Sequence, residues 1–157
     1  MEDGHLTIYR RKIEAVTICI VHCSDSDNIE HDNIETITRW HIERGFDDIG
    51  YHYFIKKSGE IQVGRALEIV GAHVEGFNSE SVGICLSGNR NFTDDQMVSA
   101  AKLIDSLYLF LPNLKKKFGV LPHRFFNPNK TCPNFELSRI FKHMTANHAV
   151  GMTGKYL

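Results

Sequence analysis

The sequence predicts a single α/β domain with a central mixed β-sheet flanked by helices. Strand-like and helix-like segments alternate along the chain, and one pair of strands is spaced as a hairpin, which a purely parallel sheet does not contain. No repeat, low-complexity tract or change in composition divides the 157 residues, and 42% of them are hydrophobic, which suffices for one core. We place the domain at residues 15–146, between an N-terminal extension (1–14) and a C-terminal tail (147–157) without periodicity.

The first predicted strand covers Val16–Cys23, where apolar residues occupy both alternating faces. A strand with two apolar faces belongs inside a sheet that helices cover on both sides. His22 lies at its carboxyl end, the edge at which ligands commonly gather in such sheets. The polar residues 24–31 that follow are expected to form a loop.

A helix and a hairpin are expected next. Asp32 followed by Glu35 predicts a capping box, and Gly45 is typical of the residue that ends a helix. Two short strand-like runs, Tyr51–Lys56 and Glu60–Gly64, flank a turn-forming Lys-Ser-Gly sequence. They therefore predict an antiparallel pair of strands.

The second half of the chain contains one predicted strand and two predicted helices. Ser81–Ser87 alternates as a strand with one strongly apolar face. Thr93 and Gln96 form a second capping-box pattern, which opens a long helix with an apolar stripe that Pro112 ends. A last helix is expected over about residues 135–144, with its apolar residues directed inward.

Charge and composition exclude several classes of protein. The net charge of −1 at pH 7 offers no surface for a polyanion, so no nucleic-acid partner is expected. No stretch approaches transmembrane length, which argues against membrane insertion, and the N-terminus lacks the apolar core of a secretory signal. We therefore expect synthesis in the cytoplasm.

The cysteines show no paired framework, and Cys19, Cys23 and Cys85 lie in apolar stretches where cysteine acts as a small hydrophobe.

Three residues far apart in the chain carry soft-metal donors: His22, His123 and Cys132. Two imidazoles and one thiolate are the usual number of protein ligands at a catalytic zinc ion, because the fourth position stays open for water or substrate. A structural zinc site is normally closed by four ligands. The set therefore predicts a zinc hydrolase, although other divalent ions also bind such donors.

Four blocks of sequence, in order, carry a resemblance to a known family: VHCS, RWHIERGFDDIGYHYFI, GRALEIVGAHVEGFNSESVGICLSGN and PHR…NKTCP. Together they resemble the zinc-dependent N-acetylmuramoyl-L-alanine amidases of type 2, above all the short phage endolysins and the related peptidoglycan recognition proteins. The resemblance runs from about Ala15 to Phe141. It implies the amidase and peptidoglycan recognition protein fold, one zinc ion, and bacterial peptidoglycan as the partner.

The resemblance also implies roles for single residues. His22, His123 and Cys132 would be the zinc ligands, and Tyr51 would be the active-site tyrosine beside the metal. Lys130 would face the substrate carbonyl, where an ammonium group can stabilise the developing oxyanion. A phenol with an ordinary pKa of about 10 is a weak base, so we expect Tyr51 to orient groups rather than accept a proton. The stretch RFFNPN between His123 and Lys130 departs from the family pattern.

The remaining polar residues of the motifs are expected to line the groove, shape a loop or pack in the core rather than to bind metal. His73 lies in a glycine-rich segment that is typical of an active-site loop, and the resemblance implies that it lines the substrate groove. Asn78 is a second groove candidate, but Asn78 and Ser81 are expected chiefly to shape this loop by side-chain-to-backbone hydrogen bonds. His52 and His41 are expected to be packed rather than to bind metal.

The resemblance implies an amidase that cuts the bond between the lactyl group of N-acetylmuramic acid and L-alanine. The resemblance suggests a monomeric phage or prophage endolysin that is made in the cytoplasm and reaches the wall, by way of the periplasm, once the inner membrane is opened. A cytosolic amidase that recycles muropeptides is an alternative. Another alternative is a recognition protein that binds peptidoglycan without cutting it, but the presence of Cys132 together with Lys130 and Tyr51 argues against it. The sequence gives no independent sign of a regulatory protein partner.

Overall fold

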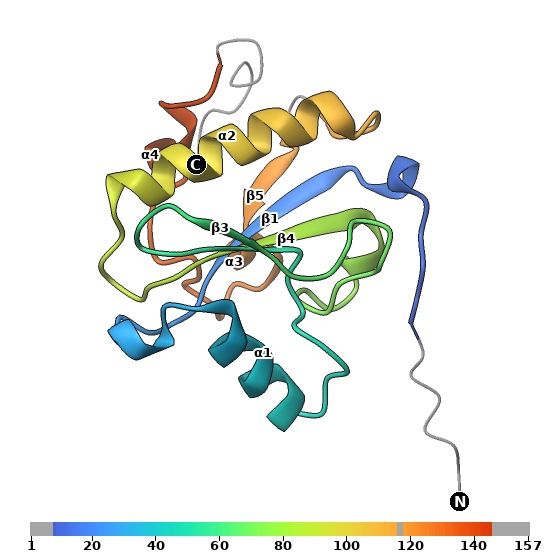
Figure 1. The fold of residues 1–157 in the computed structure, drawn as a ribbon. Helices are drawn as coiled ribbons and strands as arrows, with labels where there is room; N and C mark the ends of the chain where they lie inside the picture. The colour runs from blue at the N-terminus through green and yellow to red at the C-terminus, as the bar shows by residue number, and fades with distance from the viewer. Residues whose placement is uncertain (1–7, 116–117, 146–157) are drawn as a thin grey trace, which may run out of the picture.

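The computed structural model describes residues 8–115 and 118–145, and its centre is a five-stranded sheet in the order β3-β2-β4-β1-β5 (Figure 1). β1 pairs in parallel with β4 and β5, β2 pairs in parallel with β4, and the β2–β3 hairpin is antiparallel, so the predicted mixed sheet is confirmed. The strands are β1 (Ile18–Cys23), β2 (Tyr53–Ile55), β3 (Ile61–Val63), β4 (Ser81–Leu86) and β5 (Val120–Pro122).

Helices cover both faces of this sheet. Figure 1 shows α2 and α4 on one side and α1 on the other. All six residues of β1 and all six of β4 are buried. The sequence predicts this for β1, which is apolar on both faces, but indicates only one strongly apolar face for β4. The helices are α1 (Ile34–Glu43), α2 (Asp94–Phe110), α3 (His123–Phe126) and α4 (Ser138–Phe141), and η1 (Ile13–Ala15), η2 (Ile29–His31) and η3 (Asn78–Glu80) are single 3-10 turns.

Alternation along β4 divides the core between the two sides. Ile84 packs in the cluster that includes Ile104 of α2, whereas its neighbour Cys85 packs with Ile37 of α1. α2 begins with the predicted capping box of Thr93 and Gln96 and ends before Pro112, as expected. The long parallel strands β1 and β4 are thereby packed between helices, and their carboxyl ends lie together at one edge of the sheet.

Several predicted element starts are wrong, including that of the hairpin, whose first strand begins at Tyr53 rather than Tyr51. Asn33, not Asp32, caps α1: the Asn33 side chain accepts a hydrogen bond from the Thr36 backbone N–H. Asp32 is engaged elsewhere, because its Oδ1 accepts from the backbone N–H of Lys57 at 2.9 Å. The first strand begins two residues later than predicted, at Ile18, because η1 and its connection precede it.

The last predicted helix is shorter than its pattern suggested. Only Ser138–Phe141 are helical, and the bonds from the N–H groups of Arg139 and Ile140 span three residues, which is the tighter 3-10 pattern. The apolar residues of the pattern are nevertheless buried: Phe135, Leu137, Ile140, Phe141 and Met144. No helix of the described ranges is long and apolar enough to cross a membrane.

The proposed domain limits stay predictions. Arg11 precedes the predicted boundary, yet its guanidinium donates to the carbonyls of Leu67 and Ser81 at 2.9 and 2.7 Å and so joins this segment to the sheet. The predicted tail, 147–157, lies outside the described residues.

Candidate metal centre and active site

Two neighbouring parallel strands bring the candidate metal ligands together. His22 is the penultimate residue of β1, and His123 follows directly after β5, so both histidines leave the sheet at the same edge. Cys132 returns to this edge after α3, where its carbonyl accepts from the backbone N–H of Arg124 at 2.9 Å. One donor atom from each of the three residues lies within 4.8 Å of the other two. The sequence located His22 at a strand end but not β5, whose three residues are too few to show a pattern.

The chemistry of the three donors fits a divalent cation. His22 is 1% exposed, and burial, with the neighbouring histidines adding to it, lowers its pKa well below the usual range. Its imidazole is therefore neutral and keeps a lone pair for a metal. The contact with Cys23 and burial raise the pKa of the Cys132 thiol, so a thiolate here needs a cation beside it. The backbone N–H of Cys23 already points at the Cys132 sulfur, 3.2 Å away.

Tyr51 and Lys130 lie on the same pocket as these donors. The pocket encloses about 410 Å³, and its lining includes Tyr51, Lys130 and all three candidate ligands. The Tyr51 ring lies 5.0 Å from the His22 ring, measured between centroids. Burial, followed by the nearby thiols of Cys85 and Cys132, raises the pKa of Tyr51 well above its ordinary value. A phenol in this environment keeps its proton, which matches an orienting group better than a base.

The glycine-rich loop, residues 71–78, contributes His73 to the lining of the pocket. The carbonyl oxygen of the Asn78 side chain accepts from the backbone N–H groups of His73 and Val74, both at 2.9 Å, so Asn78 shapes the loop as expected. His73 lines the pocket, and its Nδ1 lies 2.8 Å from Nε2 of His22. No pattern in the sequence predicts this contact, because the two histidines are 51 positions apart.

His52 and His41 are packed, as predicted. His52 is fully buried, and its Nδ1 accepts from the backbone N–H of Gly83 at 3.0 Å. His41 accepts from the backbone N–H of Gly50 at 2.8 Å. Both imidazoles therefore satisfy backbone donors near the site.

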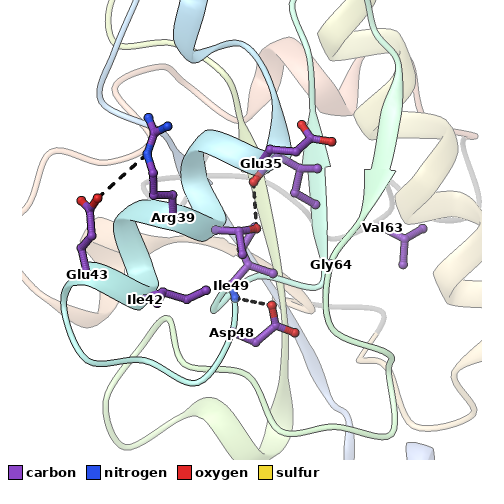
Figure 2. Close-up of a pocket in the computed structure, with 10 residues that line it drawn as sticks. Glu35, Arg39, Ile42, Glu43, Asp48, Ile49, Val63 and Gly64 are labelled. Carbon is purple, nitrogen blue, oxygen red and sulfur yellow. Dashed lines mark hydrogen bonds and ion pairs between the residues drawn. The ribbon is translucent and has the colours of Figure 1, made fainter.

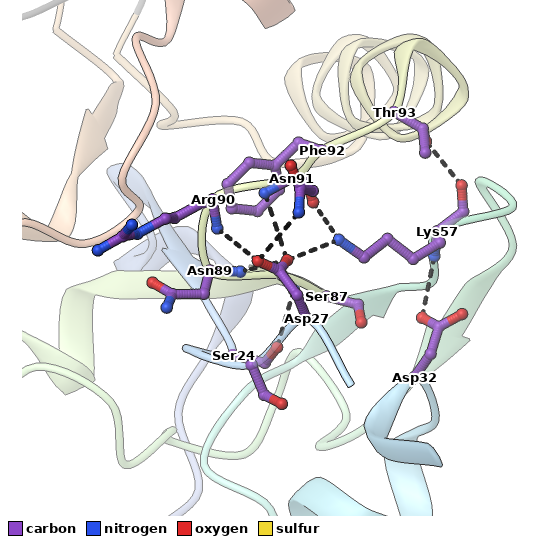
Figure 3. A network of polar contacts seen from close by, with 12 residues as sticks. Ser24, Asp27, Asp32, Lys57, Ser87, Asn89, Arg90, Asn91, Phe92 and Thr93 are labelled. Carbon is purple, nitrogen blue, oxygen red and sulfur yellow. Dashed lines mark hydrogen bonds and ion pairs between the residues drawn. The ribbon is translucent and has the colours of Figure 1, made fainter. Parts of the chain in front are cut away.

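A network around the Asp27 carboxylate, at the surface of the protein, connects loops near the pocket (Figure 3). The Asp27 carboxylate accepts from the backbone N–H groups of Asn89, Arg90 and Asn91 and from the ammonium group of Lys57. Asn89 in turn accepts two bonds from the side-chain amide of Asn134, at 3.0 and 2.9 Å. The loop after β1 is thereby connected, through the loop after β4, to the segment that carries Cys132. The sequence placed Asp27 in a polar loop without predicting this role.

A second hollow lies between α1 and β3, and its lining shares no residue with the pocket of the candidate ligands (Figure 2). Ile42, Ile49 and Val63 provide its apolar surface, and Figure 2 shows Glu43 of its lining paired with Arg39. Three carboxylates line it (Glu35, Glu43 and Asp48), but within the described residues the donors that lie close enough together to hold a metal are His22, His123 and Cys132. The first pocket is therefore the better candidate for chemistry.

Comparison with known proteins agrees with this choice. The family model described as N-acetylmuramoyl-L-alanine amidase matches residues 10–135. The endolysin of Enterobacteria phage K11 is 36% identical over 130 residues, which span 78% of this chain and 83% of that protein. The solved N-acetylmuramoyl-L-alanine amidase LysC from Clostridium intestinale URNW superposes with a TM-score of 0.72 at 28% identity, covering 83% of this chain and 87% of that one.

A recognition protein shares the fold as well. Wild-type Drosophila PGRP-LB superposes with a TM-score of 0.69 at 27% identity and covers 88% of both chains. The predicted amidase and peptidoglycan recognition protein-like architecture is thus confirmed. From the extent of the family match and the identity to the phage protein, the chain belongs to the N-acetylmuramoyl-L-alanine amidase family.

Proposed function

We propose that this chain is a zinc-dependent amidase of bacterial peptidoglycan, which hydrolyses the amide between the lactyl group of N-acetylmuramic acid and L-alanine. Membership of the amidase family supports the reaction. The observation that carries the proposal is the convergence of His22, His123 and Cys132 on one pocket that Tyr51 and Lys130 also line.

His22, His123 and Cys132 are the proposed zinc ligands. Two neutral imidazoles and one thiolate match the ligand types of catalytic zinc sites and leave one position open. When bound, zinc supplies a Lewis acid that activates water and polarises the scissile carbonyl. The backbone N–H of Cys23 stabilises the negative charge on the Cys132 sulfur.

Lys130 and Tyr51 are the proposed catalytic residues. Attack on an amide carbonyl places negative charge on its oxygen, and the Lys130 ammonium would stabilise that charge at the mouth of the pocket. The Tyr51 hydroxyl keeps its proton, since burial raises its pKa, and would orient the attacking water by hydrogen bonding. His73 remains a candidate groove residue, and the engagement of Asn78 with backbone N–H groups favours a role in loop shape.

The proposed setting is phage-induced lysis. The endolysin of Enterobacteria phage K11 is covered over 83% of its length, which supports a role of the endolysin type. We propose that the protein is a monomer that is made in the cytoplasm and acts on the cell wall after release into the periplasm.

Mass spectrometry of digested peptidoglycan tests the proposal. Purified sacculi are incubated with the wild-type protein, with and without a chelator, and with Cys132→Ala. Free stem peptides that begin at L-alanine, lost on chelation and in Cys132→Ala, are expected. Cys19→Ala is the matched control, because Cys19 is a free cysteine buried in the core away from the pocket.

Two other outcomes are informative. Uncut glycopeptides with the protein bound to the wall would contradict the amidase and indicate a recognition protein. Cleavage of soluble muropeptides but not of sacculi would keep the chemistry and reject the endolysin role in favour of recycling.

A further inference from the structure

His73 lies between a candidate metal ligand and a buried hydroxyl. Its Nδ1 is 2.8 Å from Nε2 of His22, and its Nε2 is 3.3 Å from Oγ of Ser81. Ser81 is fully buried, so water does not compete for its hydroxyl. Each nitrogen of the His73 ring therefore contacts one polar atom, in a chain that runs from His22 through His73 to Ser81. The hydrogen bond that the Ser81 hydroxyl makes beyond this chain determines which nitrogen of each ring carries a proton.

The far end is the backbone carbonyl of Phe77. The Ser81 hydroxyl donates its only proton to this carbonyl at 2.8 Å. Its oxygen therefore offers a lone pair to His73, and Nε2 of His73 must carry the proton that is donated to it. A neutral His73 then has no proton on Nδ1, which becomes an acceptor.

The tautomer of His73 in turn determines that of His22. Because Nδ1 of His73 accepts, Nε2 of His22 must donate and carry the proton of that ring. The lone pair of His22 is thereby left on Nδ1, the nitrogen that remains for the candidate metal pocket. The reverse arrangement would place a proton on Nδ1 of His22 and would require Ser81 to give up its bond to Phe77.

Close packing also restrains the orientation of the His73 ring. A methyl group at Gly83 would approach two ring carbons of His73 at 2.8 Å, and one at Gly71 would approach the ring at 2.8 Å. The Asn78 side chain fixes the backbone of His73 from the other side. The ring is therefore confined before any metal binds.

We propose that His73 is a positioning residue that fixes the tautomer and orientation of His22, with Ser81 and the Phe77 carbonyl setting its own tautomer. This inference rests on the proposed function for the identity of the metal. It assigns to His73 an effect on metal affinity that a residue of the groove wall would not have. Partners of this kind elsewhere contribute roughly 10–100-fold to metal affinity or activity.

The test is a zinc-affinity series on the full chain, measured by competition with a chromophoric chelator. His73→Leu removes the acceptor for Nε2 of His22, and its zinc affinity is expected to fall about 10–100-fold. His73→Gln offers a side-chain carbonyl as acceptor and is expected to recover much of the loss. Ser81→Ala is expected to weaken zinc binding several-fold, because it frees the tautomer of His73 without removing the ring.

Ser26→Ala is the matched control, because Ser26 and His31 form a similar serine–histidine pair, 2.7 Å apart, and neither residue lines the pocket. Its zinc affinity is expected to equal that of the wild type. Cobalt substitution gives a second readout: the charge-transfer band from the Cys132 thiolate should persist in His73→Leu while the ligand-field bands shift. Thermal melting of the metal-free proteins separates a folding defect from a loss of affinity.

Equal zinc affinity in His73→Leu, Ser81→Ala and the wild type would overturn the positioning role. If His73→Leu does not fold, Ser81→Ala and His73→Gln decide the matter alone. A wild-type protein that binds zinc but releases no stem peptide would reject the proposed function, while the affinity series would still decide the role of His73.

Discussion

The two walls of the pocket are built in opposite ways. The inner wall, His22, Tyr51 and His73, comes from the sheet edge and the glycine-rich loop, and His22 is almost fully buried there. The outer wall, residues 127–134, follows α3, and Lys130 and Thr131 within it are exposed. Packing therefore fixes the neutral side chains of His22, Tyr51 and His73 on one side. The Lys130 ammonium lies on the other side, where contact with water avoids the cost of burying its charge. Separate parts of the fold thus supply the packed neutral groups and the ammonium group.

Lys130→Met tests the charge of the outer wall and is expected to lower kcat more than Tyr51→Phe or Gly83→Ala does. Loss of one donor to an oxyanion costs roughly 100–1000-fold in kcat. Because Lys130 is exposed, zinc content should not change, and stability should stay within about 0.5 kcal/mol. Steady-state kinetics on peptidoglycan fragments, zinc analysis and urea unfolding measure these quantities. Lys142→Met is the control, since Lys142 is an exposed lysine outside the pocket. A loss of zinc in Lys130→Met would show that the two walls are not separate.

Tyr51→Phe tests the inner wall with almost no change in shape. A hydrogen bond to a charged group is worth about 1.5–3 kcal/mol, so kcat should fall roughly 10–150-fold. Since burial raises the pKa of Tyr51 well above its ordinary value, both proteins should have the same alkaline limb in their pH–rate profiles up to about pH 10. Tyr53→Phe, a half-buried tyrosine of β2, is the control. An alkaline limb that disappears in Tyr51→Phe would mean that Tyr51 does transfer a proton.

Gly83→Ala tests how tightly the inner wall is packed. The new methyl group would meet the His73 ring at 2.8 Å, and overpacking of this kind costs about 1–3 kcal/mol. We expect lower stability in urea unfolding together with weaker zinc binding, because the ring must shift away from His22. Gly76→Ala separates the two effects: its φ of +85° makes alanine strained, but nothing lies within 4 Å of the new methyl group. A normal zinc affinity in Gly83→Ala would show that the His73 ring can move without consequence.

The two walls also differ in how far the sequence predicts them. His22 could be placed at a sheet edge because the apolar alternation before it needs only local residues. The capping box of Thr93 and Gln96 was predictable for the same reason, since both partners lie within one turn. The shared edge of His22 and His123 depends on β5, and a three-residue strand has no period to detect.

Tertiary contacts account for the other failures. Asp32 has the residue type and spacing of a cap, but the backbone N–H of Lys57 competes for its carboxylate, and neighbouring Asn33 caps α1 instead. The bond from His22 to His73 depends on the fold bringing a loop to a strand end, as does the contact of Asp27 with the loop after β4. Such pairs leave no mark in a single sequence.

Asp27→Asn tests the support of the outer wall and is expected to have the smallest effect. Backbone N–H groups and the Lys57 ammonium hold the pKa of Asp27 well below its usual range, although its partial burial opposes this. A carboxyl whose pKa is lower in the folded than in the unfolded chain stabilises the fold above the unfolded value, about 3.9, and loses this effect as the pH falls below it. The variant should therefore be less stable than the wild type by about 1 kcal/mol, or about 2–4 °C in Tm, at pH 5–8. The difference should shrink below about pH 4. Asp47→Asn, which changes an exposed carboxyl outside the network, should show neither effect.

The Asp27 network joins backbone segments and does not include the reacting groups, so kcat of Asp27→Asn should equal that of the wild type at temperatures well below Tm. A large loss of kcat would contradict this and would mean that the network, through Asn134, determines the position of Cys132.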